Sequence, residues 1–221
     1  MRVSAVIPAL DEEAEIAAAV ASARAAGADE VVVVDGGSAD ATVTRARAAG
    51  ADCVLDAPRG RGSQLRAGAA AANGGALWFL HADARAPADA ADAIRAALAG
   101  GAAWGAFRVR HAPGSWAVRL ADRRSRRTFF PYGDQGVFCT RAAYEAIGGV
   151  PEQPLLEDLE FARRMLRAHG APTRLALELR VSARRFTARP VRTTLCWWTF
   201  PALYRLGVAP ERLARWYGAG R

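Results

Sequence analysis

Four consecutive valines, Val31–Val34, narrow the range of folds open to this chain. All four are β-branched, which is typical of a strand buried on both faces of a sheet. Similar short apolar runs occupy Val3–Ile7, Glu30–Val34, Asp52–Leu55 and Ala76–Leu80. Ala-rich segments with helical spacing separate these runs. Strand and helix alternating at this spacing predict parallel βαβ units, and hence an α/β fold.

Helices are expected to begin soon after the first two strands. Asp11 is a residue type that caps helix amino termini, and Ser38 precedes the helical segment Ala39–Ala49. Glu12 and Glu13 would lie in the first turn, where the helix dipole favours negative charge. We therefore expect Asp11 and Ser38 to act as helix caps.

The second half of the chain is less regular. Its pattern predicts strands over Trp104–His111, Gly136–Thr140 and Leu177–Val181, and a helix over Leu156–His169. The sequence contains no internal repeat, low-complexity linker or obvious domain boundary. A single domain over residues 1–221 is therefore expected.

The positive charge of the chain comes entirely from arginine. Lys and Arg together number 30, with a formal net charge of +8, and the sequence contains no Lys. An Ala-rich chain with Arg alone is most simply explained by a GC-rich coding composition, so we do not expect nucleic acid as a partner. The charge still favours anionic partners such as nucleotide diphosphates or an anionic membrane surface.

Cysteine usage and hydrophobicity predict a cytoplasmic protein. The three cysteines, Cys53, Cys139 and Cys196, are far apart and form no CxxC pair, so neither a zinc site nor a disulfide framework is expected. Met1-Arg2 leads straight into a strand-like run, so we expect no signal peptide. No run approaches 18 apolar residues, so we expect no membrane span.

Carboxylates follow three of the predicted strands. In an open parallel sheet, ligands bind beyond the carboxyl ends of the strands, so polar residues there are site candidates. Asp35 and Asp83 directly follow very apolar strands, which favours a functional role. Glu13 and Asp40 are more simply explained as helix caps or solvated turns. The acids are expected to converge on one edge of the sheet.

The position of these acids argues against two other nucleotide-binding folds. Gly60–Leu65 offers a partial G-x-G-x-x-G, but it does not follow the first strand, where three carboxylates would repel a pyrophosphate. A P-loop is excluded because the chain has no Gly-Lys-Ser/Thr. Asp35 suits a ribose hydroxyl in either kind of α/β fold and does not discriminate between them.

His81-Ala82-Asp83 occupies the place of an acidic D-x-D element after a strand. A carboxylate there can hold a divalent cation, Mg²⁺ or Mn²⁺, that also binds the two phosphates of a nucleotide diphosphate. Arg59, Arg61 and Arg66 lie nearby in the sequence and would add positive charge beside those phosphates. A solvated basic surface is the alternative for each Arg.

Two later segments carry charged candidates. Glu157-Asp158 opens the predicted helix, where acids serve as caps or, near a leaving group, deprotonate an acceptor hydroxyl. Arg184 and Arg185 stand beside an aromatic residue, either as a diphosphate clamp or as surface residues. The residues alone leave both alternatives open.

Taken in order, these segments resemble the family 2 glycosyltransferases of the GT-A fold. The matching motifs are Val6–Glu12, Val34–Thr42, Leu80–Asp83, Gly133–Gly136 and Glu157-Asp158. The chain resembles in particular a compact bacterial subgroup with an Arg-Gly-x-Gln loop, a His-Ala-Asp element and an Arg-Arg-aromatic motif. That subgroup is associated by name with radical-SAM, selenium or arsenosugar pathways.

The resemblance implies the GT-A fold, a Rossmann-like fold of nucleotide-diphospho-sugar transferases with a mostly parallel central sheet flanked by helices. It implies a nucleotide-binding half over residues 1–100 and an acceptor and catalytic half over residues 101–188. Residues 189–221 would form a C-terminal helical appendage.

The resemblance also assigns residues to the donor. Pro8, Glu12 and Asp35 would contact the nucleoside, and Arg61 and Gln64 would contact the nucleotide. Many relatives have Asn-Glu where this chain has Asp11-Glu12.

Metal, phosphate and catalytic roles follow in the same way. Asp83 would bind the nucleotide through Mg²⁺ or Mn²⁺, and Asp158 would be the catalytic base. His81 replaces the first acid of D-x-D, and would be either a neutral imidazole ligand or a neighbour that supports the site. Arg184 and Arg185 would bind phosphate.

The expected activity is transfer of a sugar from a nucleotide-diphosphate sugar to an acceptor hydroxyl, metal-assisted and inverting. Arg184-Arg185-Phe186 is similar to the Arg-Trp part of the processive relatives' Gln-x-x-Arg-Trp signature but lacks the Gln, so non-processive transfer is expected. Two alternatives are a nucleotidyltransferase that makes a sugar nucleotide and a non-enzymatic basic protein that binds RNA or a membrane.

The C-terminal segment has three interpretations. Trp197, Trp198 and Phe200 are flanked by Arg192 and Arg205. The segment could lie in a membrane interface, at the inner face, and present the enzyme to a lipid acceptor. It could instead pack on the core or form a homodimer contact. The acceptor is expected to be a small molecule or a lipid.

Overall fold

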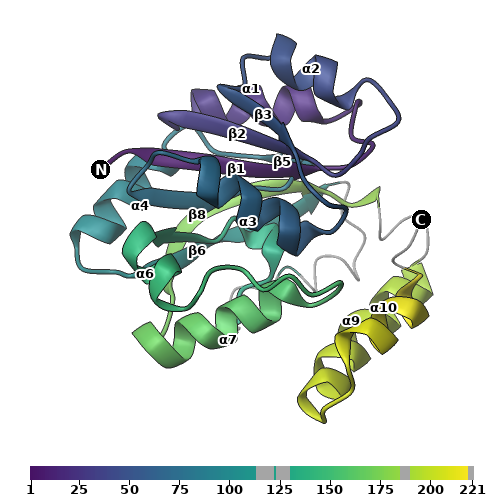
Figure 1. Cartoon of the computed structure of the whole chain (residues 1–221). Coiled ribbons are helices and arrows are strands. Elements are labelled where there is room, and N and C mark those ends of the chain that lie inside the picture. Colours follow the sequence, from purple (N-terminus) through teal and green to yellow (C-terminus); the bar gives the residue numbers. More distant parts are fainter. Residues whose placement is uncertain (113–121, 123–129, 185–189, 219–221) are drawn as a thin grey trace.

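An eight-stranded mixed sheet forms the centre of the molecule (Figure 1). The computed structural model describes residues 1–112, 122, 130–184 and 190–218, apart from the side chains of residues 190–194, 197 and 198. The strands are β1 (Val3–Ala9), β2 (Glu30–Asp35), β3 (Cys53–Asp56), β4 (Ala76–Phe79), β5 (Ala84–Arg85), β6 (Trp104–Ala112), β7 (Phe138–Thr140) and β8 (Thr173–Ser182). Their order across the sheet is β3-β2-β1-β4-β7-β6-β8-β5.

The predicted parallel units of the first half are confirmed. β1 pairs in parallel with both β2 and β4, and β2 pairs in parallel with β3. The valines of β2 are completely buried, as expected of a strand covered on both faces. Pro8 fits in this central strand because the pairing of β1 with β4 has already ended at Val6.

The second half of the sheet mixes strand directions. β7 runs antiparallel to both β4 and β6, and β5 runs antiparallel to β8. β6 and β8 pair in parallel, so four of the seven pairings among the described residues are parallel. β5 has only two residues, too few for a periodic signal, and the sequence pattern did not reveal it.

Helices cover both faces of the sheet (Figure 1). They are α1 (Ile16–Ala25), α2 (Thr42–Ala48), α3 (Arg61–Ala71), α4 (Ala90–Ala99), α6 (Arg141–Ala146), α7 (Glu157–His169), α9 (Pro190–Arg205) and α10 (Pro210–Tyr217), together with the 3-10 helix η1 (Gly133–Gln135). Buried residues of α1, α2 and α4 form one core cluster with the sheet, and those of α3, α6 and α7 form another. Two apolar layers thus fix the strand ends in space.

The structure corrects the two predicted helix caps. The residue before α1 is Glu15, and the residue before α2 is Ala41, and neither side chain caps its helix. Asp11 instead has a positive φ of 51° and accepts a hydrogen bond from the amide of Ala39. Ser38 accepts one from the amide of Asp11. These polar side chains bond between loops because both helices start several residues later than expected.

α9 and α10 form a helical hairpin at the lower right of Figure 1, on the side towards which β1 runs. Cys196, Phe200 and Leu213 form its buried centre, against which Leu155 and Leu156 pack. The hairpin therefore contacts the segment directly before α7. Within the described residues, no helix has the length and hydrophobicity that crossing a membrane requires.

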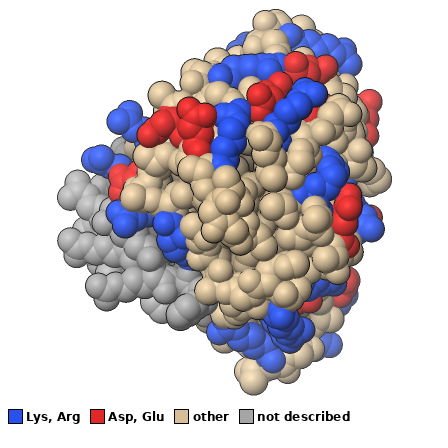
Figure 2. Space-filling view, turned by 90° about the vertical axis from the view of Figure 1, so that its left-hand side faces the viewer, with Lys and Arg blue, Asp and Glu red and all other residues tan. Residues whose placement is uncertain are grey.

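Figure 2 views the molecule from the side on which β1 begins. Basic and acidic side chains lie close together over the upper part of this face. Ion pairs join Arg24 to Asp52 and Arg95 to Asp29 at the amino-terminal ends of the strands. Arginines paired in this way add little to a continuous basic surface of the kind that holds nucleic acid.

Candidate active site

A cavity of about 740 Å³ lies at the carboxyl ends of β1 and β8. Its walls come from the loop after β1, the start of α3, the loop after β4, the end of β6, η1, the start of α7 and the α9–α10 hairpin. The cavity brings together most of the site residues predicted from the sequence. Those that line it are Pro8, Glu12, Arg61, Gln64, His81, Asp83 and Asp158.

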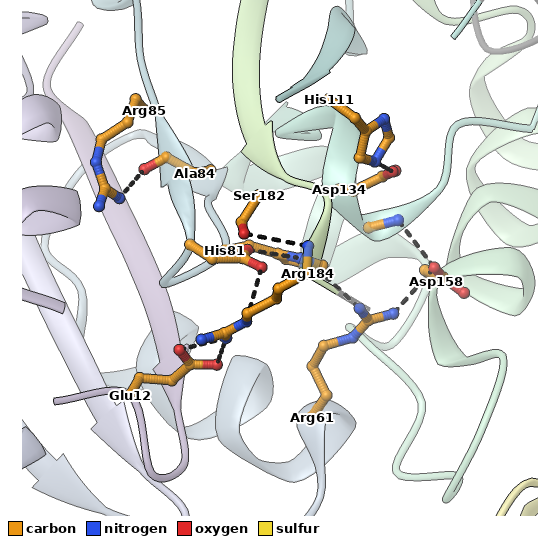
Figure 3. Close-up of polar contacts among 12 residues, drawn as sticks. Glu12, Arg61, His81, Ala84, Arg85, His111, Asp134, Asp158, Ser182 and Arg184 are labelled. Atoms are coloured by element: carbon orange, nitrogen blue, oxygen red, sulfur yellow. Dashed lines mark hydrogen bonds and ion pairs between the residues drawn. The ribbon is translucent and has the colours of Figure 1, made fainter. Parts of the chain in front are cut away.

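Arg184 lies between two acids of the cavity wall, Glu12 and Asp83. Figure 3 shows its contact with Glu12. Its guanidinium group donates to both carboxylate oxygens of Glu12, and its Nε lies 3.8 Å from Oδ2 of Asp83. The hydrogen bond with Glu12 raises the pKa of Arg184. The side chain keeps 40% of its surface exposed, so solvent reaches this ion pair. Arg185 lies outside the described residues.

Asp83 can hold a divalent cation with the help of substrate oxygens. Its carboxylate lines the cavity. Nε of Arg184 lies 3.8 Å from Oδ2 and Nδ1 of His81 lies 3.9 Å from Oδ1, and both distances are beyond direct hydrogen bonding. No group of three or more His, Cys, Asp or Glu side chains in the described part of the chain could hold a metal ion. Mg²⁺ commonly uses one or two carboxylates with phosphates and water, and this donor set fits that pattern.

His81 contacts Arg61 as well as Asp83. Its Nε2 lies 2.9 Å from Nη1 of Arg61, and its Nδ1 lies 3.9 Å from Oδ1 of Asp83. Because a guanidinium group only donates, Nε2 accepts, and a neutral ring carries its proton on Nδ1. Of the two alternatives for His81, this arrangement favours support of Asp83 over direct ligation of a cation.

Arg61 lies at the centre of an ion cluster at the start of α7. It pairs with Glu157 through Nε, and its Nη2 lies 2.9 Å from Oδ2 of Asp158. Burial lowers the pKa of Arg61, but the charges of Glu157 and Asp158 outweigh that effect and raise it. Burial also raises the pKa of Glu157, although Arg61 opposes this. These contacts turn Arg61 toward the carboxylates of α7.

Within the described part of the chain, three donors hold the carboxylate of Asp158. Oδ2 accepts from Arg61 and from the amide of Gly133 at 2.8 Å, and Oδ1 accepts from the amide of Leu159 at 2.7 Å. A carboxylate offers about four acceptor positions, so one remains for a substrate proton. Asp158 has both the fixed orientation and the spare lone pair that a general base needs.

The Arg-Gly-x-Gln segment, expected as a loop, forms the first turn of α3 and has a structural role at two of its positions. Nε2 of Gln64 donates to the carbonyl oxygens of Ala9 at 2.7 Å and Val34 at 2.9 Å, which ties the ends of β1 and β2 together. A Cβ on Gly62 would collide with the carbonyl oxygen of Pro151. This close approach explains the glycine between two cavity residues.

Asp35, like Arg184, is a predicted site residue that is not part of the cavity lining. Its carboxylate accepts hydrogen bonds from the amides of Gly37 and Ser38 and from the hydroxyl of Ser38. It is 3% exposed. In this arrangement the side chain shapes the loop after β2, and its contact with a nucleoside stays a prediction.

Sequence reasoning missed one group of the cavity wall. His111 at the end of β6 lies 2.5 Å from Oδ1 of Asp122 and 3.4 Å from Oδ2 of Asp134, measured from its two ring nitrogens. His111 and Asp134 line the cavity. The only signal was the Gly133–Gly136 motif, since nothing in the spacing couples these three residues.

These elements carry the motifs in the order that the sequence resemblance implied. The model of Glycosyl transferase family 2 matches residues 4–143. The chain belongs to glycosyl transferase family 2. None of the curated proteins matches the chain. The resemblance to the compact bacterial subgroup stays a prediction.

Solved structures share the fold of this family 2 chain. TarS of S. aureus (residues 1–349) matches with a TM-score of 0.66 and 18% identity, over 87% of this chain and 64% of that one. Glucosyl-3-phosphoglycerate synthase from Mycobacterium tuberculosis, solved with Mn²⁺, uridine diphosphate and glucosyl-3-phosphoglycerate, matches at 0.61 and 22%, over 80% and 70%. A mycobacterial protein matches at 0.57 and 22%, over 82% and 65%.

The family 2 chain spans slightly less than two thirds of the lengths of TarS and the mycobacterial protein. At these identities the likeness establishes the fold, which is the GT-A fold expected from the sequence. The α/β class and the central sheet flanked by helices are confirmed.

Proposed function

We propose that the protein transfers a sugar from a nucleotide-diphosphate sugar to an acceptor hydroxyl by a single inverting displacement assisted by a divalent cation. The observation that carries the proposal is that one cavity of a family 2 chain is lined by both Asp83 and Asp158. These residues come from different elements, and each carboxylate meets the needs of a different half of the reaction.

The donor would lie on the side of Glu12 and Asp83. Pro8 and Glu12 line the cavity at the end of β1, where the nucleoside would bind. Asp83 would hold Mg²⁺ or Mn²⁺ between itself and the diphosphate, with Arg184 close enough to contact the phosphates. The cation, when bound, would stabilise negative charge on the leaving diphosphate.

The acceptor would lie on the side of Asp158. As the acceptor oxygen attacks the anomeric carbon, its proton passes to the free position of the Asp158 carboxylate. The bond from the anomeric carbon to the diphosphate oxygen breaks, and the electron pair leaves with the nucleotide diphosphate. Attack opposite the leaving group inverts the anomeric centre.

Family membership favours sugar transfer over the two alternatives. A nucleotidyltransferase would release pyrophosphate from a nucleoside triphosphate. A non-enzymatic basic protein would bind RNA or an anionic membrane with steep salt dependence and hydrolyse no sugar nucleotide. The mixed charges of the face in Figure 2 give the RNA alternative no support.

The C-terminal hairpin adds an apolar wall to the acceptor side. Phe200, Pro201 and Tyr217 line the cavity. The described side chains thus support packing on the core, one of the three interpretations of this segment. The membrane and homodimer interpretations stay predictions, since Arg192, Trp197 and Trp198 have side chains outside the described part of the structure.

A thermal-shift panel tests the proposal. Nucleoside diphosphates and sugar nucleotides are added with and without Mn²⁺ or Mg²⁺, and binding to the folded protein raises the melting temperature. We expect a metal-dependent increase for one nucleotide, which Asp83→Ala removes. Asp92→Ala is the matched control, because the Asp92 side chain on α4 is 82% exposed. Pyrophosphate release, or salt-sensitive RNA binding without sugar-nucleotide turnover, would contradict the proposal.

A further inference from the structure

His111 is held at both ring nitrogens. Nδ1 lies 2.5 Å from Oδ1 of Asp122, and Nε2 lies 3.4 Å from Oδ2 of Asp134 (Figure 3 shows the second contact). The amide of His111 also donates to Asp122. The residue is 6% exposed. An imidazole satisfies an acceptor at each nitrogen only when both nitrogens carry protons.

The contact with Asp134 leads to the proposed base. Asp134 belongs to η1, and the preceding residue, Gly133, donates its amide to Oδ2 of Asp158 at 2.8 Å. Gly133 also leaves room for Arg61, because a Cβ there would lie 2.9 Å from Nη2 of Arg61. The short helix η1 therefore supplies one donor to Oδ2 of Asp158, the Gly133 amide, and leaves space for the other, Arg61.

We infer that His111 is a positioning residue for Asp158: it holds Asp134 and thereby fixes η1, so that Gly133 and Arg61 keep the carboxylate oriented. The role of Asp158 as base rests on the proposed function, whereas the chain of contacts from His111 to Gly133 does not. His111 itself need not touch either substrate.

The charge of His111 makes this positioning dependent on pH. Burial alone would lower the pKa of His111, but hydrogen bonds to Asp122 and Asp134 outweigh it and raise the pKa to about 9. Asp122 faces Nδ1 and Asp134 faces Nε2, on opposite sides of the ring. The ring holds Asp134 while it is protonated, and this hold is lost as the pH rises through about 9.

The test compares His111→Leu and His111→Gln with His169→Gln, the same Gln substitution at the far end of α7. Hydrogen exchange of the Gly133 amide is measured first, because it needs no substrate. We expect exchange to accelerate by on the order of tenfold in His111→Leu, less in His111→Gln, which can still donate one hydrogen bond, and not in His169→Gln.

Turnover of the sugar nucleotide selected by the thermal-shift panel is the second readout. In His111→Leu, kcat should fall by about 10- to 100-fold with an unchanged donor KM, because a misplaced base slows the chemical step without weakening donor binding. The activity of the parent protein should decline as the pH rises through about 9. This decline should be absent in His111→Leu.

Two results would overturn the inference. One is unchanged Gly133 exchange in His111→Leu, whatever the donor. The other is a variant that melts at a lower temperature but keeps the parent kcat and pH profile, which indicates a role in stability alone. If no sugar nucleotide is turned over by the parent protein, the proposed function fails instead, and the exchange measurement still decides whether His111 holds η1.

Discussion

The two sides of the cavity hold their acids in different ways. On the proposed donor side, Glu12 and Asp83 share one arginine, Arg184, which is 40% exposed and lies two residues after the end of β8. On the proposed acceptor side, Asp158 is fixed by backbone amides and by Arg61. A group that can move suits a ligand that brings its own charges, whereas a base must be oriented before the substrate arrives.

The largest effect is expected on the acceptor side. Asp158→Asn keeps the shape of the side chain but removes the proton acceptor, so turnover should fall by about 100- to 10,000-fold. Nucleotide affinity should stay within about twofold, because the interaction is made at the acceptor and not at the donor. Stopped-time assays of nucleotide diphosphate release and calorimetry measure the two quantities. A variant with the parent rate would show that another group is the base.

The next effect tests the donor side. Asp83→Ala removes the carboxylate that would hold the cation, and metal-dependent nucleotide affinity should fall by on the order of 100-fold. Affinity measured with a chelator present should hardly change. Titration of Mn²⁺ and nucleoside diphosphate by calorimetry separates these terms. Equal affinities of variant and parent protein for the metal-bound nucleotide would refute the metal role.

Arg184→Gln should have a smaller effect, and it should change the affinities for nucleoside diphosphate and for Mn²⁺ in opposite directions. Losing a charged contact to the phosphates should weaken nucleoside diphosphate binding by about tenfold. Mn²⁺ binding without nucleotide should strengthen, because the substitution removes the positively charged guanidinium group that lies between Glu12 and Asp83. Mn²⁺ titration followed by electron paramagnetic resonance measures the second quantity. If both affinities fall, Arg184 has a structural role and the donor side is as rigid as the acceptor side.

The smallest effect is expected where the donor-side loops contact each other. Asp11→Ala removes the acceptor for the amide of Ala39 and should lower the free energy of unfolding by about 1 kcal/mol. Urea denaturation measures the loss. Glu13 is a comparison, since its carboxylate accepts from Ala41 at a longer 3.3 Å. A larger loss in Glu13→Ala than in Asp11→Ala would reverse the assigned order of these contacts.

Much of the fold follows from local sequence. β2 was predicted as Glu30–Val34, because four consecutive β-branched valines are typical of a strand buried on both faces. The strand ends one residue later, at Asp35. α7 was predicted from Leu156 and begins at Glu157, while Leu156 takes a positive φ of 61°. Periodicity identifies long elements well, but the left-handed turn before α7 has no periodic signal.

The candidate site was only partly visible in the sequence. Asp83 and Asp158 stand at the end of a strand and the start of a helix, positions that a linear pattern reveals. His111 shares no motif with Asp122 or Asp134, and Asp122 lies 11 positions further along the chain. Such a cluster exists only because β6 ends beside η1, a proximity that local spacing does not encode.

The sequence by itself determined the α/β class and the edge of the sheet where the acids gather, since the hydrophobic pattern decides which runs become buried strands. Tertiary structure decided which acids face the cavity. The carboxylate of Asp35 bonds within the loop after β2 and does not line the cavity, whereas Glu12 and Asp83 line it beside Arg184. A carboxylate takes whichever donors folding brings within about 3 Å, and the donors here come from distant parts of the chain.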